Sequence, residues 1–475
     1  MVSNASSAAH EFYGSDILDK KTTMIVAAAV VVIVVIAAAA AAITRGGGDG
    51  DPGESIASQL QIMGNANDDY TIDDKDMEIV DDIIAGTKSF TDYPLADANN
   101  DGKVDASDKQ LLQDIIDRKS GTVLRVMCLD TSGNNTVVDV EYPLRNVVTY
   151  ATNMQLPVLY ANGGQYIAGY FTSSYEVAEG SINPAAKDLE SSSREISDAS
   201  WTLFTQLDAG LDTGVGAFLT DYSAVAQITA SRQADLDAAG IPLIIYPAAN
   251  AVDEITAVLT LGFLFGGDCE SLAVEYAQAS WDVVNAIDSV VGDLSDSEKT
   301  TYISCTMWIH ICEGDSTYNT TATDAGGNWY GNVNSGFGST YSGDGSTKMQ
   351  SVEALSNYQD VDVVINNRSM DWGLTADEMR DLIIDDCWEK DRDGYAVKDY
   401  FAGLEENMYF VNNILPGAVK LAYMAHILYG DDFSMEWADG ILQQFIDMGT
   451  APLEGQTVDS IPACIDHSDY LDAKA

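Results

Sequence analysis

A twelve-residue pattern occurs twice near the start of the chain and constrains its local fold more than any other feature. Residues 65–76 read NANDDYTIDDKD, and residues 97–108 read DANNDGKVDASD. Both segments carry oxygen-bearing side chains at positions 1, 3, 5, 9 and 12, and a β-branched residue at position 8. A stretch with apolar residues at helical spacing follows each segment. The chain therefore contains an internal loop–helix repeat.

The chemistry of the repeat is that of a calcium loop. Short Asp and Asn side chains at alternating positions of a tight loop converge on one point, and the carbonyl of position 7 adds a further oxygen ligand. We expect calcium to be held by Asn65, Asn67, Asp69, Thr71 and Asp76 in the first loop and by Asp97, Asn99, Asp101, Lys103 and Asp108 in the second. Because the first loop opens with a neutral Asn, we expect it to bind more weakly. The alternative is a pair of acidic turns that only cap two helices.

These two loops resemble a type I dockerin, whose calcium loops end in Asp and not in the Glu of an EF-hand. The resemblance covers roughly residues 58–120. It implies an all-α calcium module and a cohesin domain as a possible partner. A calcium-stiffened spacer without a cohesin is the alternative reading of the same residues.

The apolar run at 24–43, MIVAAAVVVIVVIAAAAAAI, predicts a transmembrane anchor. A helix of this length spans about 30 Å, the thickness of a bilayer core. Lys20 and Lys21 precede the run and Arg45 follows it, which favours a cytoplasmic segment 1–23 and an extracellular bulk. Residues 44–57 then form a Gly/Asp-rich linker. A cleavable signal peptide and a buried helix are the alternatives.

The charge of the chain excludes several classes of partner. It has 74 acidic and 23 basic residues, a net charge of -51, so nucleic acids and anionic lipid surfaces are not expected partners. The hydrophobic fraction of 46% is ordinary for a folded protein. Six cysteines and four histidines show no metal-ligand spacing, and disulfide pairing does not follow from the sequence.

From residue 121 onward, strands alternate with helices, which predicts parallel sheets covered by helices. A strand–turn–strand (TVLRVMCLD-TSGN-NTVVDVEYP) comes first, followed by buried strands around 145–153, 214–222 and 238–247. A long helical stretch with a break at 261–268 separates them from a second set that begins at 299–309. We predict an α/β fold of two lobes, 121–252 and 296–475, joined by a backbone helix at 253–295.

Five motifs in this region resemble the substrate-binding proteins of ABC transporters that take up iron–siderophores, haem and vitamin B12. They are VVDVEYPLRNVVTYATN, AAGIPLIIYP…EITAVLTLGFLFGGDCESLAVEYAQ, DAGGN, VEALSNYQDVDVVI and VNNILPGAVKLAYMAHILYGDDF. The resemblance covers about 122–450 and implies an ABC permease partner. It assigns permease docking on the second lobe to Glu353. The first-lobe counterpart would fall near Trp201–Thr202, where no Glu stands; Glu195 and Asp198 are only nearby.

The ligand of such a protein should lie between the lobes, beside loops at the carboxyl ends of strands. The candidates there are Tyr150, Asn153, Tyr222, Trp308, His310, Trp329, Tyr330 and Arg368. Aromatic rings with a few polar groups suit a large chelate, although each ring is as readily explained by packing. Arg368 could pair with an anionic ligand or stay solvated, and His310 could ligate a metal, although a lone His is more often structural.

The leading hypothesis is a membrane-anchored extracellular solute-binding protein that captures an iron or cobalt chelate and delivers it to an ABC importer. The alternative is a dockerin-bearing adhesion or scaffold protein with a degenerate cleft. A surface hydrolase is a third hypothesis, because dockerins often accompany glycoside hydrolases. No Gly-x-Ser-x-Gly, P-loop or HExxH motif occurs, so we do not expect an enzyme.

Overall fold

The computed structural model describes residues 59–475 apart from short gaps. The gaps are 172–181, 191–194, 248–249, 307–309, 313, 315, 335–336, 338–346, 350–357, 359, 393–394, 400 and 402. The predicted anchor at 24–43 lies outside the described residues. Within them, no helix is both long enough and apolar enough to cross a membrane. All six cysteines are free thiols, five of them buried.

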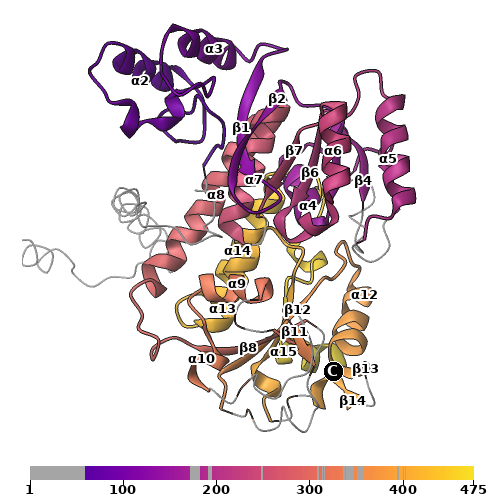
Figure 1. Cartoon of the computed structure of the whole chain (residues 1–475). Helices are drawn as coiled ribbons and strands as arrows, with labels where there is room; N and C mark the ends of the chain where they lie inside the picture. The colour runs from indigo at the N-terminus through magenta and orange to yellow at the C-terminus, as the bar shows by residue number, and fades with distance from the viewer. Residues whose placement is uncertain are drawn as a thin grey trace, which may run out of the picture. The chain divides into compact units, whose positions relative to one another are not determined.

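The loop–helix repeat forms two matched helices, α2 (Asp74–Ile84) and α3 (Ala106–Ile116) (Figure 1). Each begins with the same capping box, in which an N-cap Asp and the Asp three residues later bond each other's backbone N–H. The N-cap residues are Asp73 and Asp105, the position-9 residues of the two loops. The predicted loop–helix alternation is therefore confirmed as local structure.

A hairpin of β1 (Val123–Leu129) and β2 (Asn135–Glu141) follows the module, as the strand–turn–strand pattern predicts. The segment before the first loop lies along its edge: Ile62 forms a bridge with Val126, and the Met127 N–H donates to the Gln61 carbonyl at 3.0 Å. Leu60 and Ile62 are fully buried there, in the same apolar core as β1 and lobe 1. The module is thus packed onto the rest of the chain and is not a free appendage.

Lobe 1 is built on five parallel strands in the order β5-β4-β3-β6-β7. Their bounds are β3 (Val147–Tyr150), β4 (Ile167–Phe171), β5 (Lys187–Asp188), β6 (Ala217–Asp221) and β7 (Leu243–Tyr246). Every residue of β3, β6 and β7 is buried, as expected for strands covered on both faces of a sheet. The helices of this lobe are α4 (Thr152–Tyr160), α5 (Asp198–Gly210) and α6 (Ala230–Ala239).

Lobe 2 contains a second sheet in the order β11-β9-β8-β12-β15-β16, with β10 pairing β8. Its core strands β8 (Thr301–Cys305), β12 (Val363–Arg368) and β15 (Met408–Asn412) run parallel. The other strands of this sheet are β9 (His310–Cys312), β10 (Asn328–Trp329), β11 (Thr347–Met349) and β16 (Cys464–Ile465). Outside the sheet, β13 (Asp391–Arg392) and β14 (Tyr395–Ala396) pair as a small antiparallel hairpin. The helices are α9 (Thr317–Asp324), α10 (Tyr330–Val333), α12 (Ala376–Asp381), α13 (Gly417–Leu428), α14 (Met435–Asp447) and α15 (His467–Lys474).

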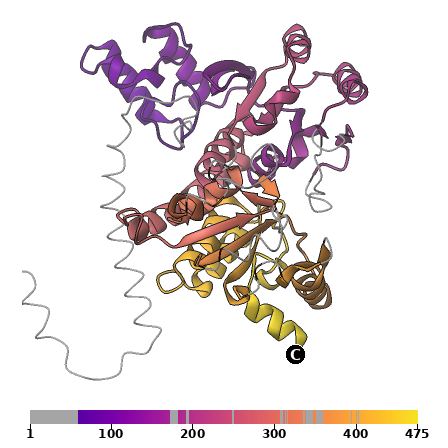
Figure 2. The ribbon, with the colours of Figure 1, turned by 60° about the horizontal axis from the view of Figure 1, so that its bottom comes forward.

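Two helices join the lobes where the sequence predicts one interrupted backbone helix. They are α7 (Ala251–Phe265) and α8 (Asp268–Val291), separated by Gly266 and Gly267. Both glycines have positive φ, 73° and 61°, which ends α7 and lets the chain turn. The helices pack closely, since a Cβ on Gly262 would lie 2.3 Å from that of Ala273. Figures 1 and 2 show α8 as the long helix that reaches from lobe 1 to lobe 2.

Candidate functional site

The carboxyl ends of the lobe 1 strands carry three of the predicted ligand residues. Tyr150 ends β3 and is 1% exposed, and Asn153 lies exposed in the first turn of α4. Tyr222 follows β6 and is 38% exposed, with its hydroxyl so close to Gly133 that a Cβ there would lie 2.6 Å away. Since β3 and β6 are parallel neighbours, these residues share one edge of the sheet.

The corresponding edge of lobe 2 carries His310 and Arg368. His310 begins β9, which runs antiparallel to β8 and so starts beside the end of β8. Arg368 ends β12, and its Nη1 donates to the Asp386 carbonyl at 2.7 Å. Trp308 lies outside the described residues. The structure therefore brings five of the eight predicted residues to the two strand edges.

Trp329 and Tyr330 lie elsewhere. Trp329 pairs with Tyr302, near the start of β8. On the other side of β8, Tyr302 pairs with Val363 of β12, and Arg368 lies five residues further along that strand. At about 3.3 Å per residue, Trp329 and Arg368 are on the order of 16 Å apart along the strands. Tyr330 is 1% exposed and its hydroxyl bonds Asp360, just before β12. Both rings belong to the packing of lobe 2.

A buried contact joins the lobes at the start of α7. Glu254 is 9% exposed, and its carboxylate accepts hydrogen bonds from the Tyr276 hydroxyl at 2.5 Å and the Gly417 N–H at 2.6 Å. Gly417 begins α13, directly after the ligand edge of lobe 2. Beside this contact, the Tyr160 hydroxyl of α4 donates to the Ile414 carbonyl at 3.0 Å. These bonds place the ligand edges of both sheets next to one junction.

Burial controls the charges at this junction. It raises the pKa of Asp253 to about 7, with the negative charge of Asp324 adding to the effect. Burial also raises the pKa of Glu254, opposed by its bonds to Tyr276 and Gly417 and by the charge of Lys420. The pKa of Lys420 is lowered by the same desolvation, against the attraction of the two carboxylates Glu254 and Asp324. The junction therefore gathers two acids and one lysine whose pKa values are all shifted by burial.

Sequence reasoning missed this junction, although a signal was present. Glu254 stands in the first turn of α7, a helix in which 14 of 15 residues are buried. An acid inside such an apolar run indicates a charge that must be satisfied by long-range partners. Its partners Tyr276 and Gly417 are 22 and 163 residues away, so their identity was not readable.

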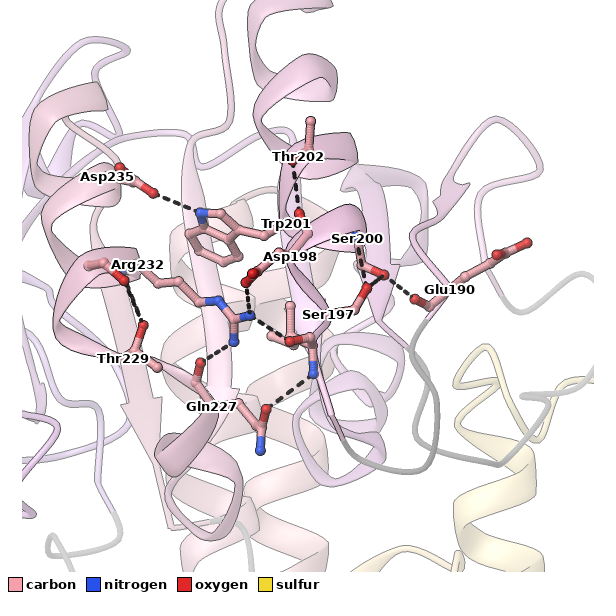
Figure 3. A network of polar contacts seen from close by, with 12 residues as sticks. Glu190, Ser197, Asp198, Ser200, Trp201, Thr202, Gln227, Thr229, Arg232 and Asp235 are labelled. Atoms are coloured by element: carbon pink, nitrogen blue, oxygen red, sulfur yellow. Dashed lines mark hydrogen bonds and ion pairs between the residues drawn. The ribbon is translucent and has the colours of Figure 1, made fainter.

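The tip of lobe 1, where the family resemblance places a docking Glu, is held by Arg232 and Trp201 (Figure 3). The Arg232 guanidinium donates to the carbonyls of Gln227 at 2.7 Å and Ile196 at 2.5 Å, and the Trp201 indole donates to Asp235 at 2.9 Å. Asp198 begins α5 with a fully exposed side chain, 3.5 Å from Arg232. Thus Asp198 is an exposed carboxylate near the expected position. Glu353, the predicted second-lobe residue, lies outside the described residues.

The two predicted calcium loops have the same internal hydrogen bonds. Both oxygens of Asp76 accept backbone N–H groups, from Asn67 at 3.1 Å and Asp73 at 2.8 Å, and Asp108 repeats this with Asn99 and Asp105 at the same distances. Asp76 and Asp108 are fully buried. Burial raises the pKa of Asp76 to about 6, against the two backbone hydrogen bonds, which lower it, and with the charges of Asp69 and Asp73 adding to the rise.

The loops differ at position 1. The Asn65 amide donates to the Leu60 and Asp69 carbonyls at 3.1 and 2.8 Å, whereas both Asp97 oxygens accept N–H groups, from Asp101 and Gly102. Across the described ranges, no three Asp, Glu, His or Cys side chains form a group able to hold a metal ion. The predicted sets depend also on Asn and backbone oxygens, so their oxygen chemistry fits calcium while its binding stays a prediction.

No protein-family model and no curated protein matches the chain. Among solved structures, it is similar to the TroA-like periplasmic binding protein FepB from Veillonella parvula, with a TM-score of 0.53 and 16% identity over 72% of this chain and 99% of that one. It is also similar to Helicobacter pylori CeuE with Ni(II) bound, with a TM-score of 0.45 and 10% identity over 70% and 98%. The α/β prediction is confirmed, and the described chain has the fold of TroA-like periplasmic binding proteins.

Proposed function

We propose that the chain is a non-enzymatic solute-binding protein that captures a ligand between its lobes and delivers it to an ABC permease. The observation that carries this proposal is the Glu254 junction. It brings the carboxyl ends of the parallel strands of both sheets, with Tyr150, Asn153, His310 and Arg368 at these edges, next to one buried interlobe contact. Open α/β sheets bind their ligands at these ends.

An iron or cobalt chelate, such as a siderophore, haem or a corrinoid, is the ligand class that we propose. Its support is the ordered set of five sequence motifs and the aromatic and cationic groups at the edges. Arg368 is suited to an anionic group on the ligand, since only its Nη1 bonds the protein among the described residues. His310, partly exposed at the start of β9, is suited to a metal or to a polar substituent.

Thermal unfolding with a panel of ferric siderophores, haem and cobalamin tests this proposal. A cognate chelate should raise the melting temperature in a saturable manner. Arg368→Gln should weaken the response, whereas Arg380→Gln, which changes an exposed arginine of the same lobe, should leave it intact. No stabilisation by any chelate, or an undiminished response in Arg368→Gln, would count against the proposed site.

The remaining parts of the chain would position this binding protein. We propose that residues 24–43 anchor it in the cell membrane with its bulk outside, and that Glu353 and the exposed Asp198 face the permease. Charge reversal at Asp198 should lower ligand-stimulated ATPase activity of a reconstituted transporter while ligand affinity stays unchanged. A parallel loss of ligand affinity would show that the change acts on the lobe itself.

Calcium in the two loops is the second part of the proposal, and it is supported by the matched Asp76 and Asp108 geometry. Calorimetric titration of chelator-treated protein should show a stronger site lost in Asp108→Asn and a weaker one lost in Asp76→Asn. A cohesin partner and an adhesion role remain the alternative function, favoured by the missing first-lobe Glu. Pull-down of a cohesin-bearing protein without a permease would support that alternative.

A further inference from the structure

A cavity of about 300 Å³ lies at the end of lobe 1 that is opposite to the carboxyl ends of its strands, where we place the chelate. Its walls come from the stretch just before β3, the stretch just before β4 and the α7–α8 turn. The cavity is therefore at the amino ends of the parallel strands, whereas the proposed chelate site is at their carboxyl ends. Among its lining residues are Arg118, Tyr142, Arg145, Tyr166, Gly267 and Asp268.

Arg145 presents an unused binding edge to this cavity. Its Nη1 donates to the carbonyls of Leu144 at 2.7 Å and Phe265 at 2.9 Å, and its guanidinium lies 4.0 Å from the centre of the Tyr166 ring. These contacts fix the plane of the group. In the described part of the chain, no carboxylate pairs with Arg145, and its Nε and Nη2 donate to no protein acceptor. The N–H groups of Nε and Nη2 point in parallel, and together they can bind a carboxylate or a phosphate through two hydrogen bonds.

Tyr142 supplies a second donor. It is only 7% exposed, yet its hydroxyl has no hydrogen-bond partner among the described residues. The hydroxyl lies against the α7–α8 turn so closely that a Cβ on Gly266 would be 2.2 Å away. The hydroxyl oxygen keeps some contact with solvent, so it can donate to water or to a ligand in the cavity that Tyr142 lines.

The amino terminus of α8 contributes the third favourable feature. Gly267 is the N-cap, so no side chain bonds the first N–H groups of this 24-residue helix. Such an end carries partial positive charge and attracts anions. Of the nearby acids, Glu270 is already paired with Arg118, and Asp268 is exposed. Arg145 is then the cation at this site that is left without a partner.

We propose that this cavity binds a small oxyanion, a carboxylate or a phosphate, through the free edge of Arg145 and the Tyr142 hydroxyl at the start of α8. Because Arg118 and Ser120 of the calcium-loop module also line the cavity, the bound anion would join that module to lobe 1 and to the α7–α8 turn. This anion site would be separate from the site of the transported ligand. A bound anion would hold the module, lobe 1 and the α7–α8 turn in a fixed arrangement.

The test is thermal unfolding of the full-length chain titrated with inorganic phosphate in one arm and with citrate in the other. Ionic strength is held constant with chloride, because a chain of net charge -51 responds to salt alone. We expect a saturable rise of about 2–5 °C in at least one arm. The arm that responds identifies the anion as a phosphate or a carboxylate.

Two variants and a control assign the response to the cavity. Tyr142→Phe keeps the ring and removes only the hydroxyl, so it should raise the half-saturating concentration about tenfold or less. Arg145→Gln should abolish the response, and Arg380→Gln should leave it unchanged. If Arg145→Gln does not fold, Tyr142→Phe and Arg145→Lys, which keeps the charge without the fork, decide the question. No saturable rise in either arm, or equal curves for wild type and both cavity variants, would overturn the proposal.

Discussion

The two ends of α7 make opposite kinds of contact. At its start, the acids Asp253 and Glu254 are buried, and Glu254 bonds α8 and lobe 2 through neutral donors. At its end, Arg145 donates to the Phe265 carbonyl, and the Arg118 guanidinium lies 4.3 Å from the centre of the Phe263 ring. Acids at the amino end and cations at the carboxyl end both complement the helix dipole.

The two ends of α7 therefore stabilise different contacts. The amino end has buried acids and joins lobe to lobe, so burial shifts the pKa of these acids and makes the contact sensitive to pH. The carboxyl end is partly open and lies beside a salt bridge that joins α8 to the loop–helix module at 58–120, between Arg118 and Glu270, whose side chains are 25% and 18% exposed. Variants at the amino end should therefore have larger effects on stability than variants at the carboxyl end.

The largest effect is expected from Glu254→Ala. This change leaves the Tyr276 hydroxyl and the Gly417 N–H buried without an acceptor, which should lower the free energy of unfolding by roughly 3–5 kcal/mol. Urea denaturation measures it. Glu254→Gln keeps one acceptor and should lose less, and the exposed Glu275→Ala on α8 should change little. A loss below about 1 kcal/mol for Glu254→Ala would mean that this contact does not hold the lobes together.

Asp253→Asn should change the pH dependence of stability. The pKa of Asp253 is about 7 in the folded chain, above its ordinary value of 3.8, so its protonated form is favoured by folding. The stability that this group contributes is complete below about pH 4 and is lost as pH rises through 7. Relative to Asp253→Asn, the wild type should lose at most about 4 kcal/mol between pH 4 and pH 8.

Melting curves of both proteins across that range, with exposed Asp212→Asn as control, measure the difference. Parallel pH profiles for wild type and Asp253→Asn would show that Asp253 is ionised at little cost in the folded chain.

At the carboxyl end, Arg118→Ala should cost about 2 kcal/mol, because it removes the bonds to Glu270 and the contact with the Phe263 ring. Arg118→Lys keeps the charge but not the fork and should be intermediate. The neighbouring Lys119→Ala, which breaks a more exposed pair with Asp114, serves as the control. If Arg118→Ala matches this control in a thermal melt, the salt bridge does not stabilise the contact between the loop–helix module and α8.

The smallest effect is expected from Tyr160→Phe, which removes only the interlobe hydrogen bond to the Ile414 carbonyl. The ring stays stacked on Tyr276, with centroids 5.6 Å apart, so the loss should be about 1 kcal/mol. Chemical denaturation measures it, with Tyr222→Phe as a matched change at an exposed ring. A loss as large as that of Glu254→Ala would show that the two bonds act as one network.

What the sequence predicted well was local. The helices after the two loops, the buried runs of β3, β6 and β7, and the hairpin turn before Asn135 all depend on residues a few positions apart. The contacts that join the parts were not predictable, because Arg118 meets Glu270 across 152 residues and Glu254 meets Gly417 across 163. For the same reason, Trp329 and Tyr330 were assigned to the ligand edge, although β10 pairs near the start of β8.

The strand-like segment at 60–63 has a consequence for where this chain can be divided. By composition and by resemblance, the two-lobed part begins near residue 121, which is where a cut to separate it from the predicted calcium loops would be made. Such a cut would expose the apolar surface that Leu60 and Ile62 cover and would leave β1 without the backbone bonds to Gln61 and Met63. The part of the chain that folds together is thus longer than the part that resembles the two-lobed fold. A truncated chain that starts at residue 121 should therefore aggregate, whereas one that starts before residue 59 should stay in solution.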